Sequence, residues 1–114
     1  MTPNDEDRLR DMVLYCEKAL RFVAGRQRQD VEADEILCLA LVRVLEIIGE
    51  AAAQLAAETR SAHPQIPWAD IIGMRNRIVH TYTRIDMDII WQTLNDDLRP
   101  LIDELKPILS DDPA

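Results

Sequence analysis

The chain has 114 residues, of which 47% are hydrophobic, 30% charged and 4% aromatic. This length and apolar content suit one domain with a real core, over residues 1–114, and exclude a disordered chain or a collagen-like repeat. Abundant alanine, leucine and glutamate, with few aromatic and β-branched residues, favour helices over strands.

Thirteen basic and twenty-one acidic residues give a net charge of −8, which disfavours non-specific nucleic-acid binding because phosphate attraction needs basic surface. The charge is unevenly distributed. Residues 67–85 contain three arginines and one aspartate, a local charge of +2, whereas residues 86–114 contain eight acids and two bases, a local charge of −6. A basic island on an acidic protein indicates a localised site.

Hydrophobic residues at spacings of three and four predict a first helix that is capped by Asn4 or Asp5 and ends near Gly25. A second helix is predicted from about Glu32 to about Thr59. A loop follows over residues 61–66, because a proline at position 64 disfavours a helical conformation of the residue before it.

The most apolar stretch, residues 36–57, raises the question of a membrane span. Four polar residues interrupt it at spacings of three and four and form one stripe along a helix: Arg43, Glu46, Glu50 and Gln54. A charge at the bilayer centre costs about 3 kcal/mol or more, so we interpret this segment as a buried helix. A four-helix bundle leaves each helix one exposed side, and we expect a second subunit to cover it here.

Pro67 suits the first position of a third helix that continues to about His80. Asp86 caps a fourth helix, and Pro100 is expected to kink or divide that helix near Leu98 or Arg99. Residues 110–114 are expected to form a disordered tail. The predicted fold class is all-α, an antiparallel bundle of four to five helices in which no strand alternation is apparent.

The two cysteines, Cys16 and Cys38, sit at apolar helical positions without a CxxC pattern. Together with the lack of a signal peptide, this predicts a reducing, cytoplasmic location and no membrane attachment. No glycine-rich phosphate loop and no metal-ligand spacing occur, so we expect no cofactor and no metal. Adjacent carboxylates at 96–97 and 103–104 are interpreted as surface solvation, because neighbours on a helix point in different directions.

Residues 75–82, Arg-Asn-Arg-Ile-Val-His-Thr-Tyr, concentrate the side chains that carry chemistry. Asn76 and His80 are four apart and share a face of the predicted helix, and the long Arg75 side chain can converge on His80 at the helix end. A guanidinium binds phosphate bidentately, and an imidazole exchanges protons near pH 7. This combination can act on a phosphodiester without a metal ion.

A structural interpretation stands beside the catalytic one. An arginine and a histidine at a helix C-terminus commonly bond its last carbonyls and lie favourably near the negative end of the helix dipole. Ion pairs between the polar stripe and the basic island can be purely structural, or they can orient a catalytic arginine. The candidates are Arg43, Glu46 and Glu50 on the second helix, and Arg75 and Arg77 on the third.

The same eight residues fit the pattern R-x4-H-x-Y, and further segments of the chain agree with it in order. This set resembles the HepT toxins, a family within the HEPN superfamily of helical ribonucleases, over nearly the whole chain. Thr81, between the histidine and the tyrosine, departs from the glycine that the family often has there. The agreeing segments outside the motif are Glu46–Ala51, Ile66–Trp68, Trp91 and Asp97–Leu101.

The resemblance implies a helical homodimer that brings two R-x4-H motifs into one cleft and acts as a metal-independent endoribonuclease on RNA. It implies that Arg75 and His80 are catalytic, and that Tyr82 receives AMP from a partner, a small nucleotidyltransferase antitoxin of the MntA type. A larger hetero-oligomer with this antitoxin is also implied. The supporting residues are Asn76, Arg77 and Glu46.

For the chemistry we expect attack of a ribose 2′-hydroxyl on the adjacent phosphate, with His80 as general base or acid and Arg75 stabilising the developing charge. Asn76 would hold a phosphate oxygen. Each chain has a single good proton-transfer group, so a dimer would supply the second. Two alternatives require no catalysis: a HEPN-like nucleotide-binding module or scaffold for a nucleotidyltransferase, and a structural partner whose acidic face docks another protein.

Overall fold

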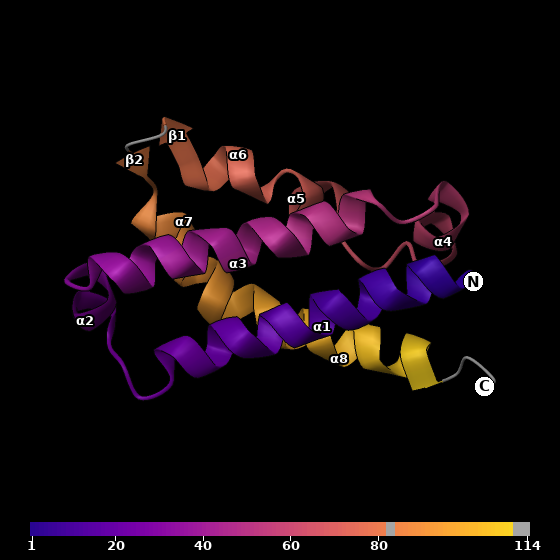
Figure 1. Ribbon diagram of the computed structural model, residues 1–114, viewed down its shortest axis with the longest axis horizontal. Coiled ribbons are helices and arrows are strands. Elements are labelled where there is room, and N and C mark those ends of the chain that lie inside the picture. The colour runs from indigo at the N-terminus through magenta and orange to yellow at the C-terminus, as the bar shows by residue number, and fades with distance from the viewer. Residues whose placement is uncertain (82–83, 111–114) are drawn as a thin grey trace.

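The structure is a computed structural model that describes residues 1–81 and 84–110, with the backbone alone at residues 80 and 81. The helices run back and forth along the longest axis of the molecule, which measures 45 × 29 × 20 Å (Figure 1). The elements are α1 (Pro3–Val23), α2 (Arg28–Glu32), α3 (Glu35–Ala53), α4 (Ala57–Ala62), α5 (Trp68–Ile72), α6 (Met74–Ile78), β1 (Val79–Thr81), β2 (Arg84–Ile85), α7 (Met87–Gln92), the π-helix η1 (Thr93–Asp97) and α8 (Leu98–Ser110).

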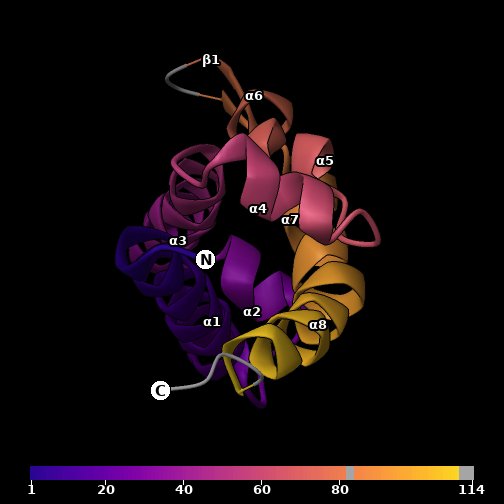
Figure 2. The same cartoon turned by 90° about the vertical axis from the view of Figure 1, so that its right-hand side faces the viewer.

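The predicted fold class, an all-α antiparallel bundle, is confirmed. Helix α1 packs against α3 and α8, and α3 also packs against α5 and α6. Seen along the helices, α1 and α3 form one side of the bundle and α5, α7 and α8 the other (Figure 2). The core between them consists of aliphatic side chains, and burying each contributes about 1.5–3 kcal/mol. Its fully buried members include Leu9, Met12, Leu41, Leu45, Ile48, Leu98 and Leu105.

Helix α1 begins two residues earlier than predicted, because Thr2 is its N-cap and Pro3 suits its first turn. The Thr2 side chain accepts a hydrogen bond of 3.1 Å from the backbone N–H of Asp5. Gly25, just beyond the helix end, has φ +74°, as a glycine that terminates a helix commonly does. The Asp5 side chain has another role, since it is buried against α4.

The predicted second helix is wrong at both ends. Asp34 caps α3 by accepting a hydrogen bond of 3.0 Å from the backbone N–H of Leu37, so α2 is a separate turn. At the other end, a carboxylate oxygen of Asp5 accepts from the backbone N–H of Ala56 at 3.2 Å, and Thr59 donates its hydroxyl to the second oxygen. These tertiary bonds satisfy the first turn of α4 and favour a break after α3.

Helix α3 approaches α5 closely at Gly49. A Cβ atom at this position would lie 2.8 Å from the carbonyl oxygen of Ile71, closer than real Cβ contacts come. Glycine therefore permits the two backbones to meet, and this contact positions the α5–α6 segment that carries the basic island.

The predicted third helix divides at Gly73 and ends at Ile78, two residues before His80. The chain then forms two short antiparallel strands, in which Val79 pairs with Ile85 and residue 81 with Arg84. The backbone N–H of Asp86 donates to the carbonyl of Ile78 at 2.7 Å and closes this hairpin. No strand alternation in the sequence indicates this hairpin; it forms because a β-branched residue follows Ile78 and tertiary pairing ends the helix.

The fourth predicted helix begins at its predicted cap, since Asp86 accepts a hydrogen bond of 3.1 Å from the backbone N–H of Ile89. The prediction that it divides near Leu98 is confirmed, because η1 separates α7 from α8 at that residue. Pro100 has no N–H for an ordinary helical bond to residue 96, which is consistent with this irregular turn. A second proline, Pro107, is accommodated inside α8.

Helix α8 extends to Ser110, so the first residue of the predicted tail is helical, and residues 111–114 lie outside the described residues. Over the described ranges, no helix combines the length and the hydropathy needed to cross a bilayer. Both cysteines are free thiols, and burial, with a smaller effect of Glu17, raises the pKa of Cys16 to about 12.

Candidate active site

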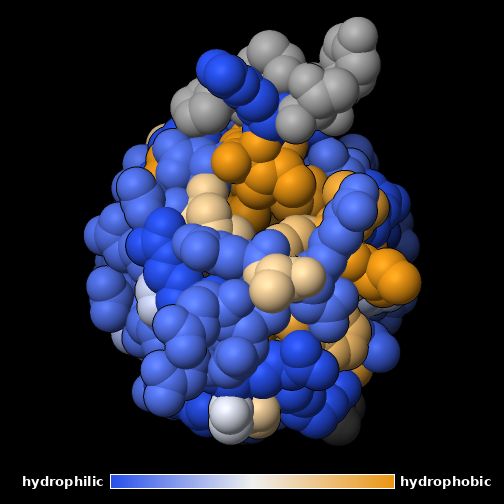
Figure 3. Space-filling view, turned by 90° about the vertical axis from the view of Figure 1, so that its left-hand side faces the viewer, coloured by the Kyte–Doolittle hydropathy of each residue, from blue (hydrophilic) through white to orange (hydrophobic). Residues whose placement is uncertain are grey.

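The motif segment lies at one end of the bundle, where α6 leads into the hairpin (Figure 1). Viewed from this end, hydrophilic residues cover most of the surface, and hydrophobic surface gathers in its upper part (Figure 3). Large hydrophobic side chains exposed on elements of this end include Ile36 and Leu39 of α3, at 82% and 56%, and Ile85 of β2, at 36%.

Arg75 on α6 forms an ion pair with Glu46 on α3, with 2.8 Å between its Nε and the Oε2 of Glu46. The other oxygen of Glu46 accepts from Arg43 at 2.9 Å, and the same Arg43 nitrogen lies 3.3 Å from Glu50. We call these four residues the ion-pair network. The predicted pairing between the polar stripe and the basic island is thus confirmed, and its partner is Arg75.

The ion-pair network holds Glu46 as a carboxylate. The hydrogen bond from Arg43 is the largest influence and lowers the pKa of Glu46; partial burial opposes this shift, and the bond from Arg75 adds to it. The Glu46 side chain is 19% exposed, whereas that of Arg75 is 59% exposed. Among the described residues, Arg75 bonds through its Nε, and the terminal nitrogens of a guanidinium have the geometry that suits a phosphate.

Arg77 lies on the opposite side of α6 from this pair. Its Nη2 donates to the backbone carbonyl of Asp70 at 3.2 Å, and its side chain lines a cavity between α5–α6 and α8. Asn76 is exposed. The structure therefore brings together Arg75 and Glu46, and it does not bring Arg77 to them.

The expectation that Asn76 and His80 share a helical face is wrong, because α6 ends at Ile78 and His80 belongs to β1. The side chain of His80 and all of Tyr82 lie outside the described residues. Convergence of Arg75 and His80 therefore stays a prediction. On the described backbone, His80 is two residues beyond the helix that carries Arg75, and Arg84 in β2 is exposed across the hairpin.

The family described as ribonuclease HepT-like matches residues 12–108 of this chain. The chain belongs to the HepT-like ribonuclease family. This membership assigns it to an enzyme class, the ribonucleases.

Relatives of this HepT-like chain match it over most of their own length. It is 38% identical over 101 residues to a "Putative RNase" of Caldanaerobacter subterraneus subsp. tengcongensis, covering 89% of this chain and 90% of the relative. It is 31% identical over 101 residues to a "Probable ribonuclease HepT" of Thermococcus cleftensis, covering 89% and 92%. A "Putative RNase" of Methanocaldococcus jannaschii is 27% identical over 103 residues, covering 90% and 85%. No solved structure matches the chain.

Sequence reasoning about the HepT-like chain missed the cavity that Arg77 lines. The adjacent carboxylates at 96–97 and 103–104 were expected to be solvated surface groups. Asp103 is exposed, and no other role is apparent for it. Asp96 and Asp97 are exposed too, but they line the cavity together with Glu104 and Asp70. No spacing along the chain signals this, because Asp70 on α5 is far in sequence from η1 and α8.

Proposed function

We propose that this HepT-like protein is a metal-independent endoribonuclease that acts on RNA in the cytoplasm. The observation that carries the proposal is the ion pair of Arg75 with Glu46, which holds an arginine in the first turn of α6 while 59% of its side chain stays exposed. An arginine held in this way is pre-oriented for a phosphate, so less side-chain entropy is lost when RNA binds.

In the proposed reaction, the ribose 2′-hydroxyl attacks the adjacent phosphorus and the bond from phosphorus to the 5′-oxygen breaks. His80 accepts the 2′-hydroxyl proton or delivers a proton to the departing 5′-oxygen. Arg75 stabilises the negative charge that develops on the phosphate oxygens, and Asn76 holds one of them. The products are a 2′,3′-cyclic phosphate and a 5′-hydroxyl.

We propose that the active form is a homodimer. One chain supplies one His80, whereas the reaction uses a base and an acid. Hydrophobic side chains exposed on α3 and β2, at the same end as the motif, support the idea that a second copy covers this end. A two-fold pair formed there would place two copies of the motif near one another.

We further propose that the protein is the toxin of a toxin–antitoxin pair, silenced by a nucleotidyltransferase of the MntA type. In this reaction the Tyr82 phenol oxygen attacks the α-phosphorus of ATP, pyrophosphate leaves, and the phenol proton passes to solvent. The new phosphodiester is an anion on a residue that lies between Arg75 and Arg84 in the sequence, and charge-assisted hydrogen bonds of about 1.5–3 kcal/mol each to these arginines would hold it where RNA phosphate binds.

The test of cleavage uses end-labelled RNA with purified protein in EDTA. We expect cyclic-phosphate products from the wild type and a loss of about 10²-fold or more in His80→Ala. His63→Ala is the matched control, since the chain has two histidines and His63 lies at the end of α4. Activity that disappears on chelation, or His80→Ala at the wild-type rate, contradicts the mechanism.

Induced expression separates the enzyme from a non-catalytic module. An active ribonuclease arrests growth and His80→Ala relieves the arrest, whereas a nucleotide-binding module or scaffold arrests growth in neither case. For the modification, intact mass is measured after incubation with the transferase, ATP and magnesium. We expect added AMP on the wild type and on Tyr15→Phe, the control at the second tyrosine, but not on Tyr82→Phe. Modified protein that still cleaves at the unmodified rate contradicts silencing.

A further inference from the structure

A cavity of about 280 Å³ opens between α5–α6 on one side and η1–α8 on the other. Its walls include the buried apolar side chains of Ile71 and Met74 from the first side, and of Leu98 and Leu101 from the second. Pockets that enclose whole drug-sized ligands measure about 300–1,000 Å³, so this one has room for one or two side chains. We call it the acidic groove, because of the residues at its rim.

Within the described part of the chain, the rim of the acidic groove carries four acids and one base. The acids are Asp70, Asp96, Asp97 and Glu104, and the base is Arg77. The hydrogen bond that Arg77 forms here goes to the backbone carbonyl of Asp70, at 3.2 Å, and no ion pair joins it to these carboxylates among the described residues. The groove therefore has an uncompensated negative charge above an apolar floor.

Two carboxylates of the acidic groove lack the contacts that would stabilise their charge. The Oε2 atom of Glu104 is buried and has no hydrogen-bond partner within the described part of the chain. Desolvation, followed by the charges of Asp96 and Asp70, raises the pKa of Asp97, and Arg77 opposes this shift. A cation placed between these groups would remove both penalties.

The π-helix η1 contributes to this placement. A π-turn is rare in helices and occurs often at functional sites. Here it carries Asp96 and Asp97, and it ends immediately before Leu98, which lies in the floor of the groove. Irregular backbone thus sets both the charged rim and part of the apolar floor.

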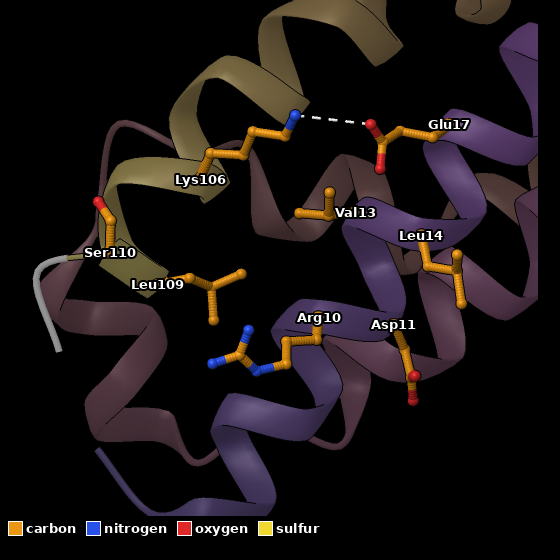
Figure 4. A pocket seen from close by; sticks show the side chains of 8 residues that line it. All are labelled: Arg10, Asp11, Val13, Leu14, Glu17, Lys106, Leu109 and Ser110. Atoms are coloured by element: carbon orange, nitrogen blue, oxygen red, sulfur yellow. Dashed lines mark hydrogen bonds and ion pairs between the residues drawn. The ribbon is translucent and has the colours of Figure 1, made fainter. Parts of the chain in front are cut away.

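A second groove, between α1 and α8, serves as a comparison because the charges of its lining residues balance (Figure 4). It is larger, about 510 Å³, and its rim has Arg10 and Lys106 beside Asp11 and Glu17. Lys106 already pairs with Glu17 at 3.5 Å. Since its charges balance, this groove has no preference for a ligand of either sign.

We propose that the acidic groove docks a segment of a partner protein in which an arginine or lysine is flanked by apolar residues. The basic group would bond to Glu104 and Asp97, and the apolar neighbours would cover the four aliphatic side chains of the floor. The acidic rim repels RNA phosphate, and the apolar floor offers nothing to a simple hydrated cation. This proposal stands on the groove alone and does not depend on ribonuclease activity.

The test uses short peptides and isotope-labelled protein in about 150 mM salt, a concentration that screens long-range attraction. The probe alternates leucine and arginine; one comparison peptide replaces arginine by glutamate, and the other replaces leucine by serine. We expect the probe to shift the backbone amide signals of Ile71, Met74, Leu98 and Leu101 and to bind at least tenfold more tightly than either comparison peptide. The groove between α1 and α8 is the internal control and should show no shifts.

Variants identify the groups that bind. Glu104→Gln is expected to lower the affinity for the probe peptide about tenfold. Asp97→Asn, at a more exposed position, should also lower this affinity and serves if Glu104→Gln proves unstable. Asp103→Asn removes the same charge from the adjacent exposed position of α8 and should change affinity less than twofold. The proposal is overturned if Asp103→Asn lowers the affinity as much as Glu104→Gln does, or if the serine peptide binds as tightly as the probe. It is also overturned if the probe shifts amide signals elsewhere or does not bind.

Discussion

Gly49→Ala probes the contact that positions the active-site arginine. The added Cβ would lie 2.8 Å from the carbonyl oxygen of Ile71, a backbone atom that no rotamer change can move away. Overpacking of this kind costs about 1–3 kcal/mol, and the better helix propensity of alanine offsets about 1 kcal/mol. We expect a net loss of up to about 2 kcal/mol in the free energy of unfolding, because α3 and α5 must separate.

The same separation moves α6 and with it Arg75, whose Nε lies 2.8 Å from Glu46. A misplacement near 1 Å can cost about 10²-fold in rate, so RNA cleavage should fall more than the loss of stability explains. Urea unfolding followed by circular dichroism measures the first effect, and the initial rate of cleavage measures the second under conditions in which the variant is folded.

Gly73→Ala is the matched control. Its Cβ would lie 3.2 Å from the carbonyl oxygen of Ala69, so a smaller displacement of the backbone would relieve the contact. It should destabilise the protein less than Gly49→Ala. A Gly49→Ala protein as stable as the wild type, with unchanged cleavage, refutes the idea that this close approach sets the position of α5 and α6.

Three further predictions concern single side chains. Asp5→Ala should lower the free energy of unfolding by about 1–3 kcal/mol in urea, because the buried carboxylate bonds α4 at two points; an unchanged midpoint contradicts this role. Arg43 lowers the pKa of Glu46, so the stability that this carboxylate contributes is fully present above its ordinary value of 4.5 and is lost as the pH falls through the lowered value. Glu46→Gln should therefore be less stable than the wild type at pH 7, by no more than about 1 kcal/mol, and a difference that grew toward pH 3 would contradict the assigned shift. Leu39→Glu on α3 should convert a sedimenting dimer into a 13.1 kDa monomer, and Leu14→Glu, an exposed leucine of α1, should leave the dimer intact.

The features that sequence predicts well here are local. Gly25 ends α1 because only a residue tolerant of positive φ suits that position, and Asp86 caps α7 through a bond to a residue three positions on. The pairing of Glu46 with Arg75 was one predicted option, because a stripe of charges along a helix must face either solvent or the next element. In each of these cases, the feature can be predicted from residues a few positions apart or from residues on one face of a helix.

The features that sequence missed are tertiary. The break between α3 and α4 depends on Asp5, about fifty residues earlier, whose carboxylate bonds Ala56 and Thr59. The helix ends at Ile78 because the hairpin backbone closes on it through Asp86. The acidic groove combines residues 67–77 with residues 96–104, and no periodicity in either segment indicates that they meet.

Helix α6 explains why two neighbouring arginines have different surroundings. Residues 75 and 77 are two positions apart, which corresponds to about 200° around a helix, so one side chain points toward α3 and the other toward η1 and α8. The basic island of the sequence is thus two sites in the fold: Arg75 with Glu46 at the proposed catalytic end, and Arg77 in the acidic groove. Because the two sites share a five-residue helix but no side chain, Glu104→Gln should leave RNA cleavage unchanged and Glu46→Gln should leave peptide binding unchanged. A variant that altered both would show that α6 moves as a unit, and docking in the groove would then act on Arg75 through the backbone between them.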